Sequence, residues 1–183
     1  MQRISEAMKI GREALKLLNY KIPAKPNQAA LAKDLIKIKL RMGRTSIEEL
    51  IDLKDLKDQN ILAIVRILSA LTVPSYIGYP AYLPVFVFKL IYLSIKHGNS
   101  IFSCYAYAVF GLIQAGAMDK INDGYAFGEL ALEVMDKYNA HQMQAKVNYI
   151  VGFMIMHWKR PVHDSFEYLL KASNTGMAIG DTS

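Results

Sequence analysis

The sequence has little cysteine, proline and tryptophan: one Cys, six Pro and one Trp among 183 residues. Because Cys104 is the single cysteine, an internal disulfide framework and a zinc site built from cysteines are excluded, and we expect a reducing, cytoplasmic compartment. Cys104 lies in the apolar stretch "SIFSCYAYAVFG", so we predict a small core residue and not a nucleophile. The hydrophobic content of 52% is sufficient for a sizeable core and excludes a disordered chain.

The sequence also lacks the short motifs of common catalytic sites. No glycine is followed by lysine, which excludes a P-loop, and Gly-x-Ser-x-Gly, His-Glu-x-x-His and Cys-x-x-Cys are absent too. His163 and Asp164 resemble the start of a phospho-accepting histidine box, but Tyr168 stands where that box has proline. We interpret Asp164 as a charge on the first turn of a helix, and we expect no catalytic residue, cofactor or metal ion in this chain.

Positive charge is concentrated in the first third of the sequence. Residues 1–66 hold fourteen Lys and Arg against eight Asp and Glu, whereas residues 67–183 hold eight of each. In the segment that follows Pro26, Lys33, Lys37 and Arg41 stand opposite an apolar stripe, which is typical of a solvated helix face. The stripe consists of Leu31, Leu35, Ile38 and Met42. We therefore do not expect a nucleic-acid partner, and any residual binding should be weak and strongly salt-dependent.

The residues before 59 are predicted to form three helices. A first amphipathic helix occupies most of residues 1–18, and a second runs from about Asn27 to Met42, where Gly43 ends it. A short third helix should begin at two overlapping capping boxes, because each pairs a hydroxyl residue with a glutamate three positions later. The boxes are Thr45 with Glu48 and Ser46 with Glu49.

The longest uncharged run, residues 67–88, is long enough to cross a membrane as a single helix. Its centre, however, contains several residues that break helices. These are Pro74, Gly78, Pro80 and Pro84. We therefore predict that one helix ends near Val73 and the next begins near Pro80, which leaves two halves too short to span a bilayer.

From residue 59 onward the sequence repeats with a period of about 41 residues. Small residues recur inside apolar runs at spacings of 41 and 41 residues, and phenylalanines recur at spacings of 41 and 39 residues. The small residues are Ala70, Gly111 and Gly152, and the phenylalanines are Phe86, Phe127 and Phe166. A small residue lets one helix approach its neighbour closely, so each repeat is interpreted as a pair of packed helices.

Each phenylalanine is expected to open the second helix of a pair, with a buried face at offsets of four, seven and eleven residues. These positions are Leu90, Leu93 and His97, then Ala131, Val134 and Tyr138, then Leu170, Ser173 and Met177. Gly98 should end one helix, and Asn99 or Ser100 should cap the next.

The predicted fold is therefore all-α: a TPR-like solenoid of antiparallel helix pairs with a repeat period of about 41 residues. We predict three pairs at residues 59–99, 100–139 and 140–183. The basic helices of residues 1–58 should pack on them as part of one continuous domain.

Several segments resemble the helical-repeat region that follows the AAA-type ATPase module in large bacterial sensor kinases and predicted signalling ATPases. They are "GREALKLLNYKIPAKP", "SIEELIDLKDLKD", "ILSALTVPSYIG", "KHGNSIFSCYAYAVFG", "DGYAFGELALEVMDK" and "FMIMHWKRPVHDSF". The most specific are the Gly-Asn-Ser at 98–100, residues 125–130, and His157-Trp158 with Pro161. The resemblance implies a piece of a longer signalling protein whose catalytic motifs lie elsewhere, and it assigns no functional residue to this chain.

The leading functional hypothesis is a non-catalytic interaction and regulatory module of bacterial signal transduction that couples an ATPase switch to kinase output. Its partner would be a protein, either the ATPase and kinase domains of the same polypeptide or a separate signalling protein. The candidate binding residues are Tyr105, Asn148 and Trp158, because aromatic and amide groups on first helices suit the concave surface of a solenoid.

Two alternatives stay open. One is a small-molecule sensor whose apolar pocket is lined by tyrosines from residues 67–116. These tyrosines are Tyr76, Tyr79, Tyr82, Tyr105 and Tyr107. The other alternative is a set of regulatory repeats from a transcription activator whose DNA-binding domain lies elsewhere.

Overall fold

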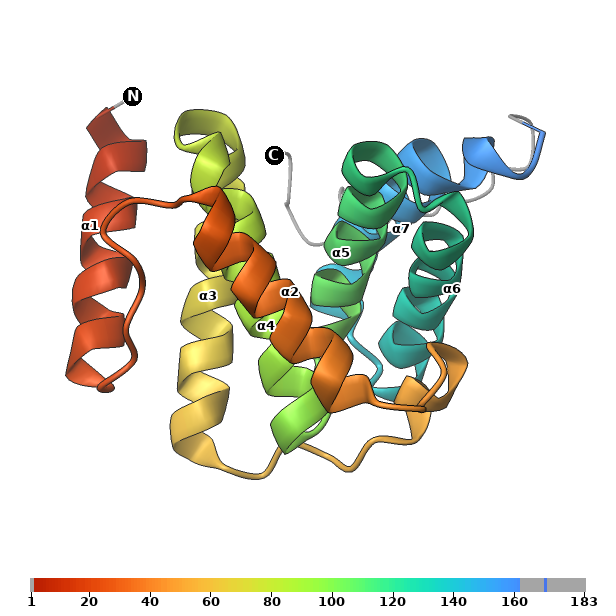
Figure 1. Cartoon of the computed structure of the whole chain (residues 1–183), viewed down its shortest axis with the longest axis horizontal. Coiled ribbons are helices and arrows are strands. Elements are labelled where there is room, and N and C mark those ends of the chain that lie inside the picture. Colours follow the sequence, from red (N-terminus) through yellow and green to blue (C-terminus); the bar gives the residue numbers. More distant parts are fainter. Residues whose placement is uncertain (1, 162–169, 171–183) are drawn as a thin grey trace. The chain divides into compact units, whose positions relative to one another are not determined.

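The structure, a computed structural model, describes residues 2–161 and residue 170. Every regular element among these residues is helical, which confirms the all-α prediction (Figure 1). The helices group into two compact units: unit 1 contains residues 1–44 and 54–98, and unit 2 contains residues 45–53 and 99–183. The division into basic helices 1–58 and three repeat pairs, and the TPR-like solenoid of antiparallel pairs, stay predictions.

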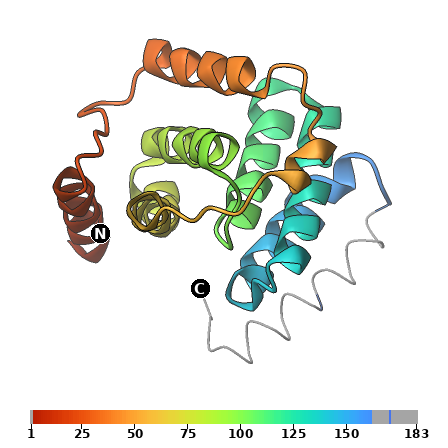
Figure 2. The same ribbon diagram turned by 90° about the horizontal axis from the view of Figure 1, so that it is seen from below.

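Unit 1 has four α-helices with a central pair. They are α1 (Gln2–Leu17), α2 (Gln28–Met42), α3 (Gln59–Gly78) and α4 (Leu83–His97), and a 3₁₀ turn, η2 (Pro80–Tyr82), joins α3 to α4. Helices α3 and α4 pack on each other, α1 covers α3, and α2 lies along α4 (Figure 2). The core therefore forms where Leu15 of α1, Ile38 of α2 and Phe86 of α4 are buried.

The helix ends of unit 1 follow the sequence signals. Asn27 caps α2, since its side-chain oxygen accepts a hydrogen bond of 2.7 Å from the N–H of Ala30. Gly43 ends α2 with φ +59°, and Gly98 ends α4 with φ +113°, as predicted. Glycine is required at 98 for a second reason, because a Cβ there would collide with the backbone carbonyl of Lys54.

The predicted end of a helix near Val73 is wrong, because α3 continues through Pro74 to Gly78. Proline removes the N–H that would bond to the carbonyl of Ala70, but Ala70 is exposed, so water can satisfy that carbonyl. Beyond the proline, the Ser75 hydroxyl donates to the carbonyl of Thr72 at 2.7 Å and the helix continues. Helix α4 then follows from the turn at Pro80, as predicted.

With its 20 residues, α3 is the one helix in the described part of the chain that is long and apolar enough to cross a membrane by length and composition. Of its most apolar window, 39% is buried inside the protein. The core helix of a soluble protein passes the same test. The expectation of no membrane span therefore cannot rest on two half-length helices, and it stays a prediction.

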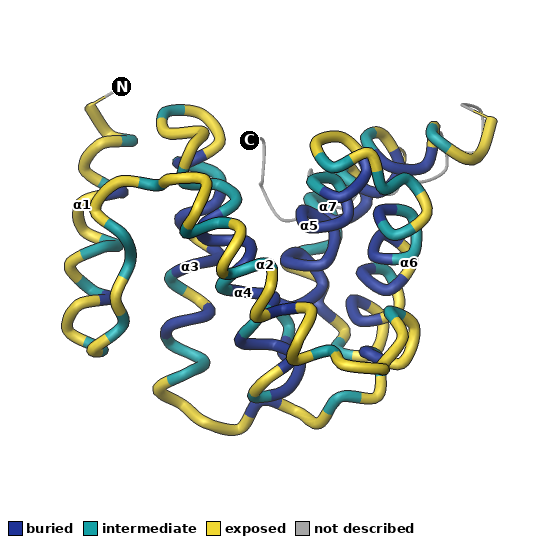
Figure 3. The backbone as a smooth tube through the Cα atoms, viewed as in Figure 1, coloured by how far each residue is buried: buried dark blue, intermediate teal, exposed yellow. Residues whose placement is uncertain are grey.

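Unit 2 is built around α5 (Ser103–Met118) and α6 (Ile121–Lys137), with α5 buried along most of its length (Figure 3). Helix α7 (His141–Tyr149) continues into a π-helical segment, η3 (Ile150–Ile155), and a 3₁₀ turn, η4 (Met156–Trp158). A further 3₁₀ turn, η1 (Glu48–Asp52), packs on α6. The second helix predicted for the last pair, with Phe166, Ser173 and Met177, lies outside the described residues.

The capping box Ser46–Glu49 starts η1 as predicted. The Ser46 N–H donates to a Glu49 carboxylate oxygen at 2.8 Å, and the Glu49 N–H donates to the Ser46 hydroxyl at 3.2 Å. Both helix-end donors are therefore satisfied within one turn.

The predicted burial pattern recurs on α4 and α6. Offsets zero, four and seven are buried in both helices, and offset eleven is partly exposed in both. The buried residues are Phe86, Leu90 and Leu93 on α4 and Phe127, Ala131 and Val134 on α6; the partly exposed ones are His97 and Tyr138. Of the third set only Leu170 is described, and it is 63% exposed, against the prediction.

A small residue does bring α5 and α6 together, but its counterpart on α3 has no such role. A Cβ on Gly111 would lie 2.7 Å from the carbonyl oxygen of Gly124 and 3.1 Å from the Cβ of Phe127. Ala70, one period earlier, is exposed, because α3 packs through other positions such as Leu68 and Leu71. The 41-residue spacing therefore identifies a close helix contact at one of these two positions.

Candidate functional site

The three predicted binding residues all lie in unit 2, on α5, α7 and η4. Tyr105 is 7% exposed and Asn148 is 2% exposed, so neither side chain is accessible to a partner in this arrangement. The Nδ2 atom of Asn148 and the Nε1 atom of the half-buried Trp158 are buried without a hydrogen-bond partner. Their proposed role in binding stays a prediction.

A buried polar cluster in unit 2 is centred on Asn99. Its side-chain amide donates to the carbonyl of Leu50 at 2.8 Å, and its side-chain oxygen accepts from the Tyr107 hydroxyl at 2.9 Å. Burial raises the pKa of Tyr107, and the neighbouring Tyr138 raises it further. The cluster joins η1 to α5. The prediction that Asn99 or Ser100 caps the next helix is wrong, because the N-cap of α5 is Phe102 and has no side-chain cap; Ser100 accepts from the N–H of Phe102 in the turn before the helix.

Cys104 is a core residue, as predicted. It is fully buried on α5, and its thiol donates to the carbonyl of Ile101 at 3.0 Å. Burial raises the pKa of Cys104 to about 12, so the thiol stays protonated at neutral pH and is a poor nucleophile. Within the part of the chain that the structure describes, no three His, Cys, Asp or Glu side chains are grouped as metal ligands.

An open groove lies in unit 1, where α1 packs on α3 through two glycines. A Cβ on Gly11 would lie 2.5 Å from Cδ2 of Leu71, and one on Gly78 would lie 2.8 Å from Cγ2 of Ile4. These glycines let α1 approach α3 closely along its length. Arg12, the residue after Gly11, is thereby held beside the turn η2.

Arg12 and Tyr82 form the base of the groove. The guanidinium of Arg12 donates to the Tyr82 hydroxyl at 2.6 Å and to the carbonyl of Pro23 at 3.3 Å, and Tyr82 donates to the carbonyl of Ala24. The Tyr82 ring stacks on the buried ring of Phe86, with 5.8 Å between centroids. The segment between α1 and α2 is therefore fastened to the turn before α4 by one arginine and one tyrosine.

The groove has a volume of about 310 Å³ and a cationic, aromatic lining. Its lining residues are Ser5, Met8, Lys9, Arg12, Glu13, Lys16, Tyr79 and Tyr82. Among the described residues, no carboxylate forms an ion pair with Lys9, Arg12 or Lys16. Three cations therefore face a groove that contains one carboxylate, which suits an anionic group on a ligand.

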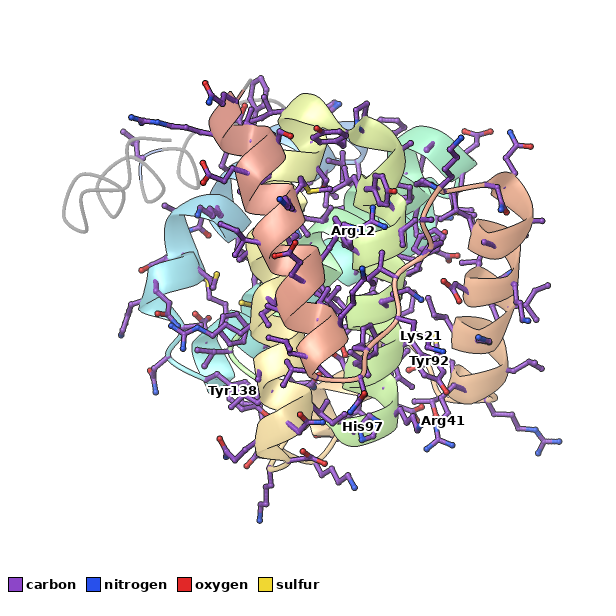
Figure 4. All side chains as sticks on the ribbon, turned by 90° about the vertical axis from the view of Figure 1, so that its left-hand side faces the viewer. Arg12, Lys21, Arg41, Tyr92, His97 and Tyr138 are labelled. Carbon is purple, nitrogen blue, oxygen red and sulfur yellow. The ribbon has the colours of Figure 1, made fainter. Side chains whose placement is uncertain are left out.

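Two further basic residues, Arg41 and His97, lie where α2 and α4 end (Figure 4). The pKa of His97 is lowered, mainly by burial and then by Lys96, with Lys54 and Arg41 acting in the same direction and Asp58 opposing them. The fold therefore favours the neutral imidazole.

Lys89 of α4 is partly buried and has its own partners. It lies 3.3 Å from a carboxylate oxygen of Asp34 and 6.0 Å from the ring centre of Tyr20. Burial raises the pKa of Tyr20, and Asp34 and Tyr92 raise it further. Lys89 therefore fastens α2 and the segment between α1 and α2 to α4, which explains why a charged residue lies between the apolar residues of this helix.

The tyrosines proposed for a small-molecule pocket are divided between the units. Tyr79 and Tyr82 line the groove of unit 1, while Tyr76 is 64% exposed. Tyr105 and Tyr107 are buried in the core of unit 2. The groove itself could not be predicted from sequence, although Lys9, Arg12 and Lys16 share one face of the first helix at i, i+3 and i+7.

The comparisons with known proteins add no assignment. No family model, no curated protein and no solved structure matches this chain.

Proposed function

We propose that this chain is a non-catalytic helical interaction module that binds a segment of a partner protein in the groove of unit 1. The observation that carries this proposal is the fixed, half-buried guanidinium of Arg12, which has no carboxylate partner in the described structure and stands between Lys9 and Lys16. Burying part of a cation without a counter-charge is unfavourable, and an acidic side chain of a partner would supply that charge.

Tyr79 and Tyr82 add apolar contact area to the same site. Tyrosines give a large contact area at a low cost in side-chain entropy, and they are enriched where proteins bind one another. The groove therefore combines one apolar wall with three cations, which suits a peptide that carries both acidic and apolar residues.

The wider architecture agrees with an interaction module. We propose that the helices form a TPR-like stack of antiparallel pairs, which in general presents extended surfaces for proteins and peptides, and the buried face that recurs on α4 and α6 supports this proposal. In the signalling proteins that the sequence resembles, such a module would relay the state of an ATPase switch to kinase output. The partner would then be a neighbouring domain or a separate signalling protein in the cytoplasm.

Peptide binding in the groove can be tested by selecting random peptides, displayed on phage, for binding to the immobilised chain. Enriched peptides should carry Asp or Glu beside an apolar residue. Their affinity for the double variant Lys9→Gln/Lys16→Gln should fall about tenfold, since two charged contacts are lost. The matched control is Lys21→Gln/Lys25→Gln, which removes the same charge from exposed positions outside the groove lining. Equal loss in both variants, or no enrichment of acidic peptides, would contradict the proposal.

A small-molecule sensor is the second candidate, because a volume of about 310 Å³ lies at the lower end of small-ligand sites. A thermal-shift screen of the chain with metabolites, in the absence of any partner protein, separates the two functions. Stabilisation that is abolished by Tyr79→Ala would favour the sensor, whereas peptide binding without any metabolite effect favours the interaction module.

A further inference from the structure

The side of α2 that faces away from α4 carries an unusual set of exposed residues. We call it the α2 outer face, and it consists of Ala29, Lys33, Ile36, Lys37 and Leu40. Their spacing of three to four residues places them on one side of the helix. The opposite side is the one that packs into unit 1, since Ile38 is 1% exposed.

Two large apolar side chains on this face are open to solvent. Ile36 is 56% exposed and Leu40, one turn later, is 77% exposed. Single exposed aliphatic residues are ordinary on protein surfaces. Here, however, they form a pair on adjacent turns, and the exposed Lys33 and Lys37 lie beside them.

No acidic side chain lies on the α2 outer face. Asp34 is the single acidic residue of α2, and its side chain is only 19% exposed. Its carboxylate lies 3.3 Å from Lys89 of α4, and 3.7 Å from Lys37 at its other oxygen. The one negative charge of the helix is thus turned toward α4, and the outer face combines apolar and cationic groups only.

The net charge of unit 1 as a whole also favours an anionic partner. It contains sixteen Lys and Arg against five Asp and Glu, a net charge of +11. Such a charge draws the unit toward any strongly anionic surface over a distance of about 10 Å at moderate salt.

We propose that the α2 outer face binds the surface of a membrane that contains anionic lipids, with α2 lying in the plane of the headgroups. A bilayer surface offers an apolar layer for Ile36 and Leu40 immediately beneath the phosphates that attract Lys33 and Lys37. The lysine stems can lie along the apolar layer while their ammonium groups reach the headgroups.

Two other partners fit this face less well. A nucleic-acid backbone offers phosphates but nothing apolar for Ile36 and Leu40. A peptide binds best in a concave site that surrounds its side chains. The outside of a single helix is convex, unlike the groove on α1. The proposal is independent of peptide binding in that groove, because none of the residues of the α2 outer face lines it.

Co-sedimentation of the full chain with sucrose-loaded vesicles tests the proposal. We expect binding to vesicles of phosphatidylcholine mixed with phosphatidylserine, and little binding to phosphatidylcholine alone. The partition coefficient should fall roughly 30-fold in Lys33→Gln/Lys37→Gln, since each lysine near an anionic surface contributes a factor of about five. It should fall at least about tenfold in Ile36→Ser/Leu40→Ser, which keeps the charge but removes the apolar contact.

Two control variants distinguish binding by the α2 outer face from non-specific attraction by the positive charge of unit 1. Lys21→Gln/Lys25→Gln removes two exposed charges from the segment between α1 and α2, and Leu17→Ser removes a side chain that is 85% exposed on α1. Both controls should retain most of the binding. Equal loss in the lysine control would overturn the proposal in favour of non-specific attraction by unit 1.

A variant that should bind more strongly keeps the test decisive if the serine variant does not fold. Leu40→Trp keeps the site apolar and adds a residue favoured at membrane interfaces, so partition should increase and its fluorescence should shift to the blue on anionic vesicles. No binding of the wild-type chain to anionic vesicles at low salt, or Leu40→Trp fluorescence unchanged by them, would overturn the proposal. Salt-tolerant binding to an acidic protein abolished by Ile36→Ser/Leu40→Ser, without vesicle binding, would assign the face to a protein partner instead.

Discussion

Unit 1 and unit 2 are both helical, but their charges and their helix contacts differ. Unit 1 has a net charge of +11, whereas unit 2 has six Lys and Arg against eleven Asp and Glu, a net charge of −5. In unit 1 the glycines Gly11 and Gly78 face flexible side chains, while in unit 2 Gly111 faces a backbone carbonyl. The difference indicates that the α5–α6 contact of unit 2 tolerates less change than the α1–α3 contact of unit 1, and that unit 1 carries the surfaces that attract anionic partners.

The polar clusters of the two units also differ in how far they are buried. Asn99 is fully buried between Leu50 and Tyr107, so its hydrogen bonds have no competition from water. Arg12 and Tyr82 are half-buried beside an open groove. A buried cluster stabilises the fold more strongly, whereas a half-buried one stays accessible to a ligand.

The largest effect is expected from Asn99→Ala in unit 2. The substitution leaves the Tyr107 hydroxyl buried without its partner and removes the side-chain hydrogen bond to the Leu50 carbonyl, which keeps only the N–H of Leu53 as a donor. It should lower the free energy of unfolding by about 3 kcal/mol. Urea denaturation measures this, and hydrogen exchange should locate the loss in unit 2. In the double variant Asn99→Ala/Tyr107→Phe, the loss should be smaller than the sum of the losses in the two single variants, because both substitutions remove the same hydrogen bond. A loss spread equally over both units would contradict the distinction between them.

A glycine comparison gives the next largest effect. Gly111→Ala places a Cβ against backbone and should lower the free energy of unfolding by about 2 kcal/mol. Gly11→Ala in unit 1 meets only the end of the Leu71 side chain, so its effect should stay below about 1 kcal/mol. Gly116→Ala is the control on the same helix as Gly111: nothing lies within 4 Å, and better helix propensity should stabilise by about 0.5–1 kcal/mol. Similar losses at Gly111 and Gly11 would show that backbone contact does not distinguish the units.

Tyr82→Phe should have a smaller effect, in unit 1. The phenyl ring keeps the stack on Phe86 but loses the hydrogen bonds with Arg12 and Ala24, which should lower the free energy of unfolding by about 1 kcal/mol. Hydrogen exchange should show faster opening of residues 18–27 and little change in unit 2. A loss as large as that of Asn99→Ala would mean that partial exposure does not weaken the Arg12–Tyr82 cluster.

The smallest effect concerns pH and His97 in unit 1. The fold lowers the pKa of His97 below its ordinary 6.5, so the unfolded chain binds this proton more readily than the folded chain. The contribution of the neutral imidazole is complete above pH 6.5 and is lost as the pH falls through the folded-state pKa. Thermal unfolding between neutral and mildly acidic pH should therefore show a smaller loss of stability in His97→Gln than in the wild-type chain. Identical profiles for the two proteins would contradict the assignment.

Sequence patterns predicted the local features correctly. The ends of α2 and α4 at Gly43 and Gly98, the Ser46–Glu49 capping box and the buried position of Cys104 are all present in the structure. Each depends on residues within a turn or two of one another, or on a continuous apolar face. The prediction that failed at Val73 treated Pro74 as a helix end, although α3 continues to Gly78 and the residue four positions before the proline, Ala70, is exposed.

The candidate site could not be predicted in the same way. Arg12 and Tyr82 are 70 residues apart in the sequence, and their contact depends on the approach of α1 to α3 at Gly11. The prediction of Tyr105 and Asn148 as binding residues depends on residue type and on their position in a first helix, and the structure buries both. Residue type indicates which chemistry is possible, whereas accessibility depends on which faces the other helices cover.

For this protein, the sequence by itself determined the all-helical composition, the ends of α2 and α4, and the buried face that recurs on α4 and α6, because local hydrogen bonding and periodicity govern these features. The tertiary structure alone decided that Arg12 meets Tyr82 beside an open groove, and that Ile36 and Leu40 stay exposed while Ile38 is buried. The physical reason is that each helix has several apolar positions, and only packing against particular neighbours determines which of them leave water.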